Sequence, residues 1–145
     1  MVKKIPKDIK VKLSNQPHAV RCVSDLVGVV SNIQKLGIKN VEFVDFFTCY
    51  DLSGVTSRRD IELIDIYSPS DAMIDATHWA QDMFDLGGQF VCMTSGEGEE
   101  FIVFSKIDGS VFEVGIEEID ELNSNQLRPK WKTFYDLIRW YVELN

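Results

Sequence analysis

Residues 90–114, FVCMTSGEGEEFIVFSKIDGSVFEV, decide the fold of this 145-residue chain. They hold three apolar runs, which predict strands over Gln89–Met93, Glu100–Lys106 and Ser110–Val114. The dipeptide Asp108-Gly109 separates the last two runs, and Asp-Gly is a strong signal for a tight β-hairpin. Because connections this short join only antiparallel neighbours, the three strands are expected to form an antiparallel meander.

Helical patterns lie on both sides of the meander. Apolar residues recur every three or four positions over residues 17–36, 41–50, 72–84 and 130–144, and this spacing predicts four helices. The predicted strands and helices are segregated along the chain rather than alternating. The expected fold class is therefore α+β, an antiparallel β-sheet with helices packed on it, in one domain spanning residues 1–145.

Three further segments bear on the edges of the sheet. Residues 61–67, IELIDIY, alternate apolar and polar side chains and predict another strand. The same alternation within residues 1–16 predicts an edge strand or an extended basic arm. The acidic residues 116–122 are compatible with a helical turn or with one more edge. The sheet is thus expected to contain the three-stranded meander plus one or two more strands.

The charge of the chain is unevenly distributed. The formal net charge is -8, but residues 1–21 contain six bases and one acid, so the remainder carries about -13. Negative charge of this density repels nucleic-acid phosphates and attracts basic proteins. The sequence therefore predicts a protein partner and no nucleic-acid partner.

The sequence also predicts a location for the chain. No apolar run approaches the roughly 20 residues that a membrane-spanning helix needs. The basic N-terminus is not followed by the apolar core of a signal peptide. We expect a cytoplasmic protein without a membrane partner. The three cysteines, Cys22, Cys49 and Cys92, are odd in number and widely spaced, so buried or half-buried free thiols are expected rather than disulfides.

Residues suited to catalysis or metal binding are scarce. The two histidines, His18 and His78, do not stand at ligand spacing from any cysteine, so neither a metal nor a cofactor is expected. Residues 94–98, TSGEG, lack the lysine of a phosphate-binding loop and suit a hairpin loop. No catalytic residue is predicted. An enzyme would become plausible only if Cys92 and His78 met within hydrogen-bond reach in a pocket.

The remaining feature is a high density of carboxylates after residue 96. Lys106 is the only base in a stretch that holds nine acids, namely Glu97, Glu99, Glu100, Asp108, Glu113, Glu117, Glu118, Asp120 and Glu121. One interpretation is a solvated face without a partner. The other is a docking face for a basic protein, with exposed aromatic residues as anchors, for which Trp131 and Trp140 are the candidates. Glu113 aside, these acids and Trp131 form the predicted binding site.

Several of these segments are similar to one known family. Residues 90–114 resemble the central meander of the SUKH superfamily, and VEFVDFFTCYDLSG (residues 41–54) resembles its early helix and turn. IELIDIYSPSD (residues 61–71) and WKTFYDLIRWYVE (residues 131–143) are similar to its next strand and its closing helix. The resemblance implies an α+β fold without enzymatic activity. Many bacterial members are immunity proteins that bind a cognate toxin, often a nuclease, in competition between cells.

The expected function is therefore that of an immunity protein, which binds and neutralises a cognate basic toxin domain. The acidic face is a hypothesis from the charges of this chain, because toxin contacts vary within the family. The alternative is a regulatory or scaffolding interaction module of the same fold. Such a module would lie beside unrelated genes and bind its partner independently of salt. The oligomeric state is left open.

Overall fold

The computed structural model describes residues 4–67, 71–95 and 100–144. Its sheet consists of β1 (Phe90–Cys92), β2 (Glu100–Ser105) and β3 (Val111–Gly115) in the order β1-β2-β3. Both pairings are antiparallel, with Val91 opposite Phe104 in the first and Glu100 opposite Gly115 in the second. The predicted meander and the α+β class are confirmed.

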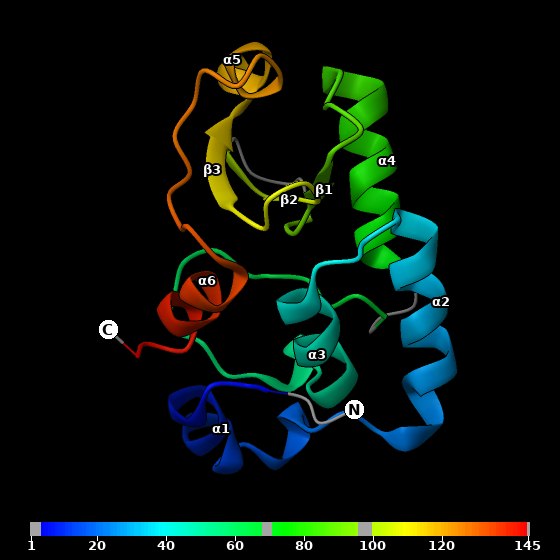
Figure 1. The fold of residues 1–145 in the computed structure, drawn as a ribbon, viewed down its shortest axis with the longest axis vertical. Coiled ribbons are helices and arrows are strands. Elements are labelled where there is room, and N and C mark those ends of the chain that lie inside the picture. Colours follow the sequence, from blue (N-terminus) through cyan, green and yellow to red (C-terminus); the bar gives the residue numbers. More distant parts are fainter. Residues whose placement is uncertain (1–3, 68–70, 96–99, 145) are drawn as a thin grey trace.

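Helices cover both faces of this sheet (Figure 1). One face packs with α3 (Val41–Cys49) and α6 (Phe134–Tyr141), and the other with α4 (Ala72–Phe84) and α5 (Ile119–Asn123). Successive side chains of a strand point to opposite faces, so β2 contributes to both cores. This double burial explains why β2 reads as an almost continuous apolar run.

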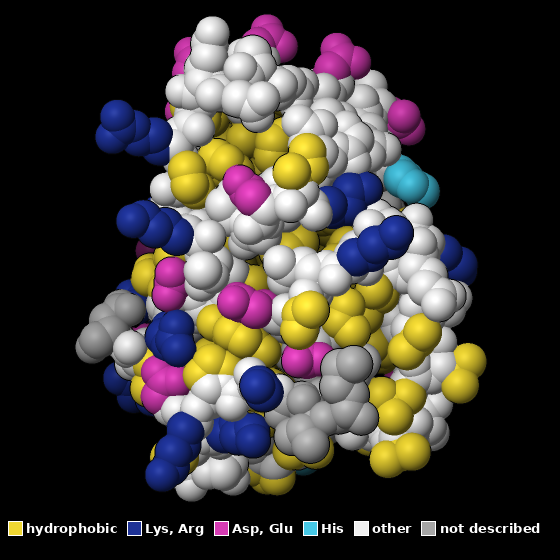
Figure 2. Space-filling view, viewed as in Figure 1, with side chains coloured by type: hydrophobic (Ala, Val, Ile, Leu, Met, Phe, Trp, Pro, Cys, Tyr) yellow, Lys and Arg dark blue, Asp and Glu magenta, His cyan; other side chains and the backbone are white. Residues whose placement is uncertain are grey.

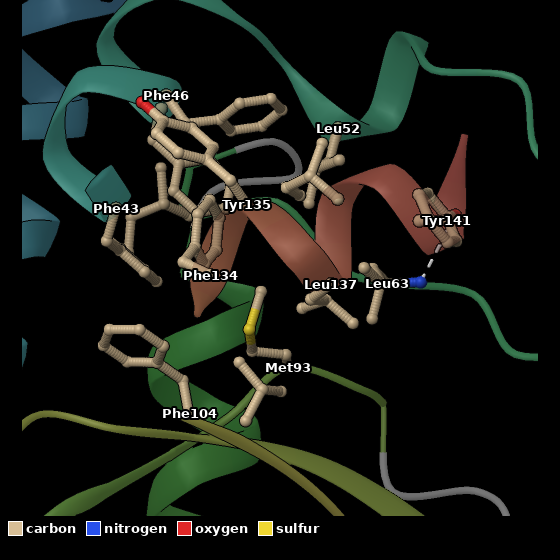
Figure 3. Close-up of a cluster of buried hydrophobic side chains, with 14 of the residues drawn as sticks. Phe43, Phe46, Leu52, Leu63, Met93, Phe104, Phe134, Tyr135, Leu137 and Tyr141 are labelled. Atoms are coloured by element: carbon tan, nitrogen blue, oxygen red, sulfur yellow. Dashed lines mark hydrogen bonds between the residues drawn. The ribbon is translucent and has the colours of Figure 1, made fainter. Parts of the chain in front are cut away.

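The larger core is rich in aromatic rings. Phe43 of α3 lies between Phe104 of β2 and Phe134 of α6, with ring centroids 4.9 and 5.2 Å away (Figure 3). All three rings are fully buried. Thr133 caps the N-terminus of α6, because its side chain accepts a hydrogen bond from the backbone N–H of Asp136. The last helix is therefore shorter than the predicted 130–144.

The helix predicted over residues 17–36 is wrong in its first half. Two short 3₁₀ turns, Pro17–Ala19 and Val23–Asp25, precede α2, which spans Leu26–Leu36. Extended backbone between the turns forms a β-bridge from Val20 to Tyr50. The valines that completed the predicted apolar stripe are in fact exposed to solvent; they are Val20, Val23, Val27 and Val30.

The strand predicted over residues 61–67 is not formed. This segment is irregular and makes one backbone hydrogen bond to the meander, from Ile64 N–H to the carbonyl of Met93. The polar residue Asp65 does not mark the solvent side of a strand. It is buried and receives two hydrogen bonds from Arg21, both 2.9 Å long. Within the described residues the sheet therefore has three strands and lacks the one or two extra strands that were predicted.

The N-terminal segment is helical rather than extended. Residues Lys7–Ser14 form α1, which buries Ile9 and Leu13 and leaves Val11 exposed. The i, i+4 spacing of the two buried residues fits a helix as well as alternation fits a strand. The prediction of an edge strand or extended arm is therefore wrong for these residues. No helix in the described ranges has the length and apolar character needed to cross a membrane.

The acidic residues after β3 are also helical. A 3₁₀ turn, Ile116–Glu118, leads into α5, so the alternative of a further sheet edge is excluded. Another 3₁₀ turn, Leu52–Gly54, occupies the position where a turn after α3 was expected. The turn Ile116–Glu118 places α5 across one end of the sheet, beside the last turn of α4 (Figure 1).

Candidate functional site: an acidic end of the sheet

Carboxylates gather at the end of the sheet where β2 begins and β3 ends. Glu100 stands directly opposite Gly115 in the β2–β3 pairing. Glu117 folds back over the same glycine, since a Cβ on Gly115 would lie 2.6 Å from a Glu117 carboxylate oxygen. Asp120 and Glu121 follow in the first turn of α5. These four predicted residues therefore lie at the same end of the sheet and all four are exposed, and Glu100 also lines a hollow together with Arg58 and Arg59.

The end of α4 adds a carboxylate that the sequence analysis missed. The side chain of Asn123 in α5 accepts a hydrogen bond from Gly87 N–H and donates one to the Asp85 carbonyl, both 2.8 Å long. These bonds hold the exposed Asp85 beside α5. We call the resulting surface the acidic end; it consists of Asp85, Glu100, Glu117, Asp120 and Glu121. Acidic side chains line the corresponding upper edge of the molecule in Figure 2.

The carboxylates of the acidic end are available to a partner. Within residues 4–67, 71–95 and 100–144, no ion pair involves any of the five. The N-terminal lysines, which could have neutralised them, belong to a segment that packs at the opposite end of the molecule (Figure 1). The negative field of this surface is therefore not cancelled by ion pairs within the described chain.

Two other predicted acids have structural roles. Glu118 accepts a 2.9 Å hydrogen bond from Gly115 N–H and caps the turn that leads into α5. Glu113 forms an ion pair of 3.1 Å with Lys130 and is partly neutralised. Both lie near the acidic end but contribute less free charge to it. Glu97 and Glu99 lie outside the described residues.

Asp108 does not belong to this surface. It lies in the β2–β3 turn, at the opposite end of a six-residue strand that spans about 20 Å. Its carboxylate accepts hydrogen bonds from the hydroxyl and backbone N–H of Ser110, which hold the pKa of Asp108 below its usual value. The prediction that the acids of residues 97–121 share one face is thus wrong for Asp108. The turn of a hairpin and its open end lie at opposite ends of the strands, so acids at the two places cannot share one surface.

The predicted aromatic anchor is also misplaced. Trp131 is only 7% exposed and packs against Trp140, with ring centroids 5.0 Å apart. The cations of Lys130 and Arg59 already lie 5.0 and 4.9 Å from the centroids of Trp131 and Trp140, respectively. A shallow hollow of about 490 Å³ borders Trp140, but its lining carries arginines as well as acids. Trp131 is therefore too buried to serve as a docking anchor, and the half-buried Trp140 already has two cations over its ring.

The described residues do not assemble catalytic groups of the kind considered from the sequence. Cys92 is buried, its thiol donates to the carbonyl of Thr94 at 3.2 Å, and burial raises the pKa of this thiol. His78 is exposed on α4 and forms no hydrogen bond with Cys92. No group of three or more His, Cys, Asp or Glu side chains in the described ranges is arranged to hold a metal ion. Cys22 is exposed, so the expectation of buried or half-buried thiols is wrong for this residue.

Comparison with known proteins gives no relative from which to transfer a function. No protein-family model matches the chain, and neither a curated protein nor a solved structure does. The similarity to the SUKH superfamily thus remains a prediction from the sequence. The functional argument rests on the fold and on the acidic end.

Proposed function

We propose that this chain is a protein-binding module that neutralises a basic toxin domain, as an immunity protein does. The observation that carries the proposal is the acidic end, where five exposed carboxylates project from α4, β2 and the α5 region without an ion pair in the described chain. The resemblance to the SUKH superfamily supports the same assignment.

The physical basis is competition for a basic surface. A nuclease binds nucleic-acid phosphates with lysine and arginine side chains. A rigid set of carboxylates offers the same side chains an alternative partner and accelerates encounter through long-range attraction. Binding of this kind occludes the substrate surface and requires no chemistry from the inhibitor. It also weakens as salt screens the charges.

A cell-protection assay tests this proposal. The chain is co-expressed with the toxin domain encoded by a neighbouring gene, and survival is compared with that of cells expressing the toxin alone. We expect the wild-type chain to protect the cells and the triple variant Glu117→Lys, Asp120→Lys, Glu121→Lys to protect them poorly. The control is Glu143→Lys, an exposed acid beside Lys12 of α1 at the other end of the molecule, which should protect like the wild type. Absence of a toxin-like gene in the neighbourhood, or no protection by the wild type, would refute the proposal.

The alternative function, a regulatory or scaffolding interaction module, also has an observation in its favour. The outer side of α2 exposes Val27 and Val30 at 84% and 43% of their surface, and Val23 in the turn before it is 82% exposed. Apolar side chains gather over α2 at the lower right of Figure 2. A contact through this surface would be insensitive to salt, whereas a contact through the acidic end would not. Salt dependence of binding therefore separates the two functions.

A further inference from the structure

The outer face of α4 exposes large apolar side chains next to carboxylates. Asp75, Trp79 and Asp82 stand at i, i+4 and i+7 and so lie on one side of the helix, with Met83 next to them. All four are exposed, Trp79 to 39% and Met83 to 62%. We call these four residues the α4 face. It presents two large apolar side chains flanked by carboxylates.

Packing holds the indole of the α4 face in place. Trp79 makes edge-to-face contacts with Phe84 at 5.2 Å and with Phe101 at 6.2 Å between ring centroids. Phe101 follows Glu100 in β2, so Trp79 lies at the same end of the sheet as the acidic end. A side chain fixed before binding loses little conformational entropy when a partner covers it. Tryptophan is also among the residues most enriched at the energetic centres of protein interfaces.

The carboxylates of the α4 face have no lysine or arginine beside them on the same helix. The helix α4, AMIDATHWAQDMF, contains no lysine or arginine, and neither Asp75 nor Asp82 takes part in an ion pair in the described ranges. The acidic end continues this charge beyond the helix C-terminus through Asp85. An apolar centre flanked by carboxylates on its own helix is complementary to an apolar side chain that lies among lysines and arginines.

We propose that the α4 face is a docking surface for a basic segment of a protein partner, which inserts an apolar side chain beside Trp79 and Met83 and pairs its flanking lysines or arginines with Asp75 and Asp82. This inference rests on the proposed function, because it takes the partner to be the same basic protein. It assigns the apolar anchors of that interface to α4 rather than to Trp131 and Trp140. We propose no docking partner for the exposed valines of α2, because α2 contains no acid that would attract a basic segment.

The probe for this surface is a synthetic amphipathic peptide of leucine and lysine, titrated into the ¹⁵N-labelled chain and followed by NMR. The comparison peptide keeps every lysine and replaces the leucines by serine. We expect the leucine–lysine peptide to shift the Trp79 indole signal and the amides of α4, and to bind at least tenfold more tightly than the serine–lysine peptide. Met83→Ser should weaken its binding roughly tenfold, while Val27→Ser, a control on α2 that is even more exposed, should leave it unchanged.

Two results would overturn this inference: equal binding of the two peptides, or shifts centred on α2 that Met83→Ser does not affect. Met83 is mostly exposed, so its substitution leaves the fold intact and the comparison valid. The titration contains no toxin, and its outcome is therefore separate from that of the cell-protection assay. Peptide binding at α4 without cell protection contradicts only the proposed function. If the Met83→Ser variant protects cells as well as the wild type and binds the peptide equally well, only the proposal for the α4 face is contradicted.

Discussion

Replacing Asp65 by asparagine should remove a large part of the stability of this fold. Asp65 forms a bidentate pair with Arg21, and the two side chains are 0% and 1% exposed. It also accepts hydrogen bonds from the backbone N–H groups of Leu52 and Tyr67. Asparagine preserves the shape but removes the charge, and its amide can then face these donors with a donor of its own. The Arg21 cation would keep the Phe47 carbonyl and at most one hydrogen bond to the amide oxygen, and its remaining carboxylate partner would be the more distant Asp51, 3.7 Å away.

The expected loss is about 3–5 kcal/mol of unfolding free energy, the usual consequence of leaving a buried charge without its partner. A domain of this size is stable by about 5–15 kcal/mol, so the variant should unfold at much lower urea concentration with an unchanged m-value. The double variant Arg21→Met, Asp65→Asn should lose clearly less than the sum of the two single losses, since it leaves no buried cation. A loss below about 1 kcal/mol for Asp65→Asn, or additive single losses, would refute this reasoning.

Three further predictions concern other parts of the chain. Gly109→Ala should cost about 1 kcal/mol or more in urea unfolding, because Gly109 has φ +78° in the β2–β3 turn; an unchanged midpoint would contradict this. Hydrogen bonding by Arg139 lowers the pKa of the exposed Asp8 below its ordinary 3.8, so this pair stabilises the fold by less than about 1 kcal/mol above that pH and loses the contribution as pH falls through the lowered pKa. Asp8→Asn should therefore differ from the wild type at pH 7 and converge with it in acid. A thiol reagent should modify the exposed Cys22 quickly and the buried Cys92 only on unfolding; equal rates would be inconsistent with the structure.

Local signals in the sequence predicted the centre of the fold well. The Asp108-Gly109 turn and the apolar runs beside it specified the meander, because so short a link joins only antiparallel neighbours. The bounds predicted for α4 coincide with the observed Ala72–Phe84, since Gly87 and Gly88 follow its periodic pattern closely. In both cases the signals lie within a few residues of the structure they specify.

The failures arise where a distant contact decides the structure. The alternation of residues 61–67 indicated a strand, but Asp65 is buried for its bond to Arg21, 44 positions away. The valines before and within α2 have the spacing of a buried stripe, and periodicity alone does not show which side of a helix meets the core. For the same reason Trp131 was predicted as an exposed anchor although the structure buries it, and the exposure of Trp79 within the helical pattern of residues 72–84 was not visible.

The candidate site was partly predictable. The clustering of acids after residue 96 indicated a negative surface, and four of these acids do lie together at the acidic end. Their grouping with Asp85 was not visible, because it depends on the hydrogen bonds that Asn123 makes to the backbone after α4. Only the packing of α5 against that segment brings the two acidic stretches into one surface.

The most direct test of the central claim is the association rate of this chain with the toxin domain encoded beside its gene, measured by stopped flow at low and at high salt. For the wild type we predict fast association that slows steeply as salt is added. Lysine in place of Glu117, Asp120 and Glu121 should slow the low-salt rate at least tenfold and flatten its dependence on salt. Identical rates and identical salt dependence for the two proteins would contradict the claim that the acidic end meets a basic partner.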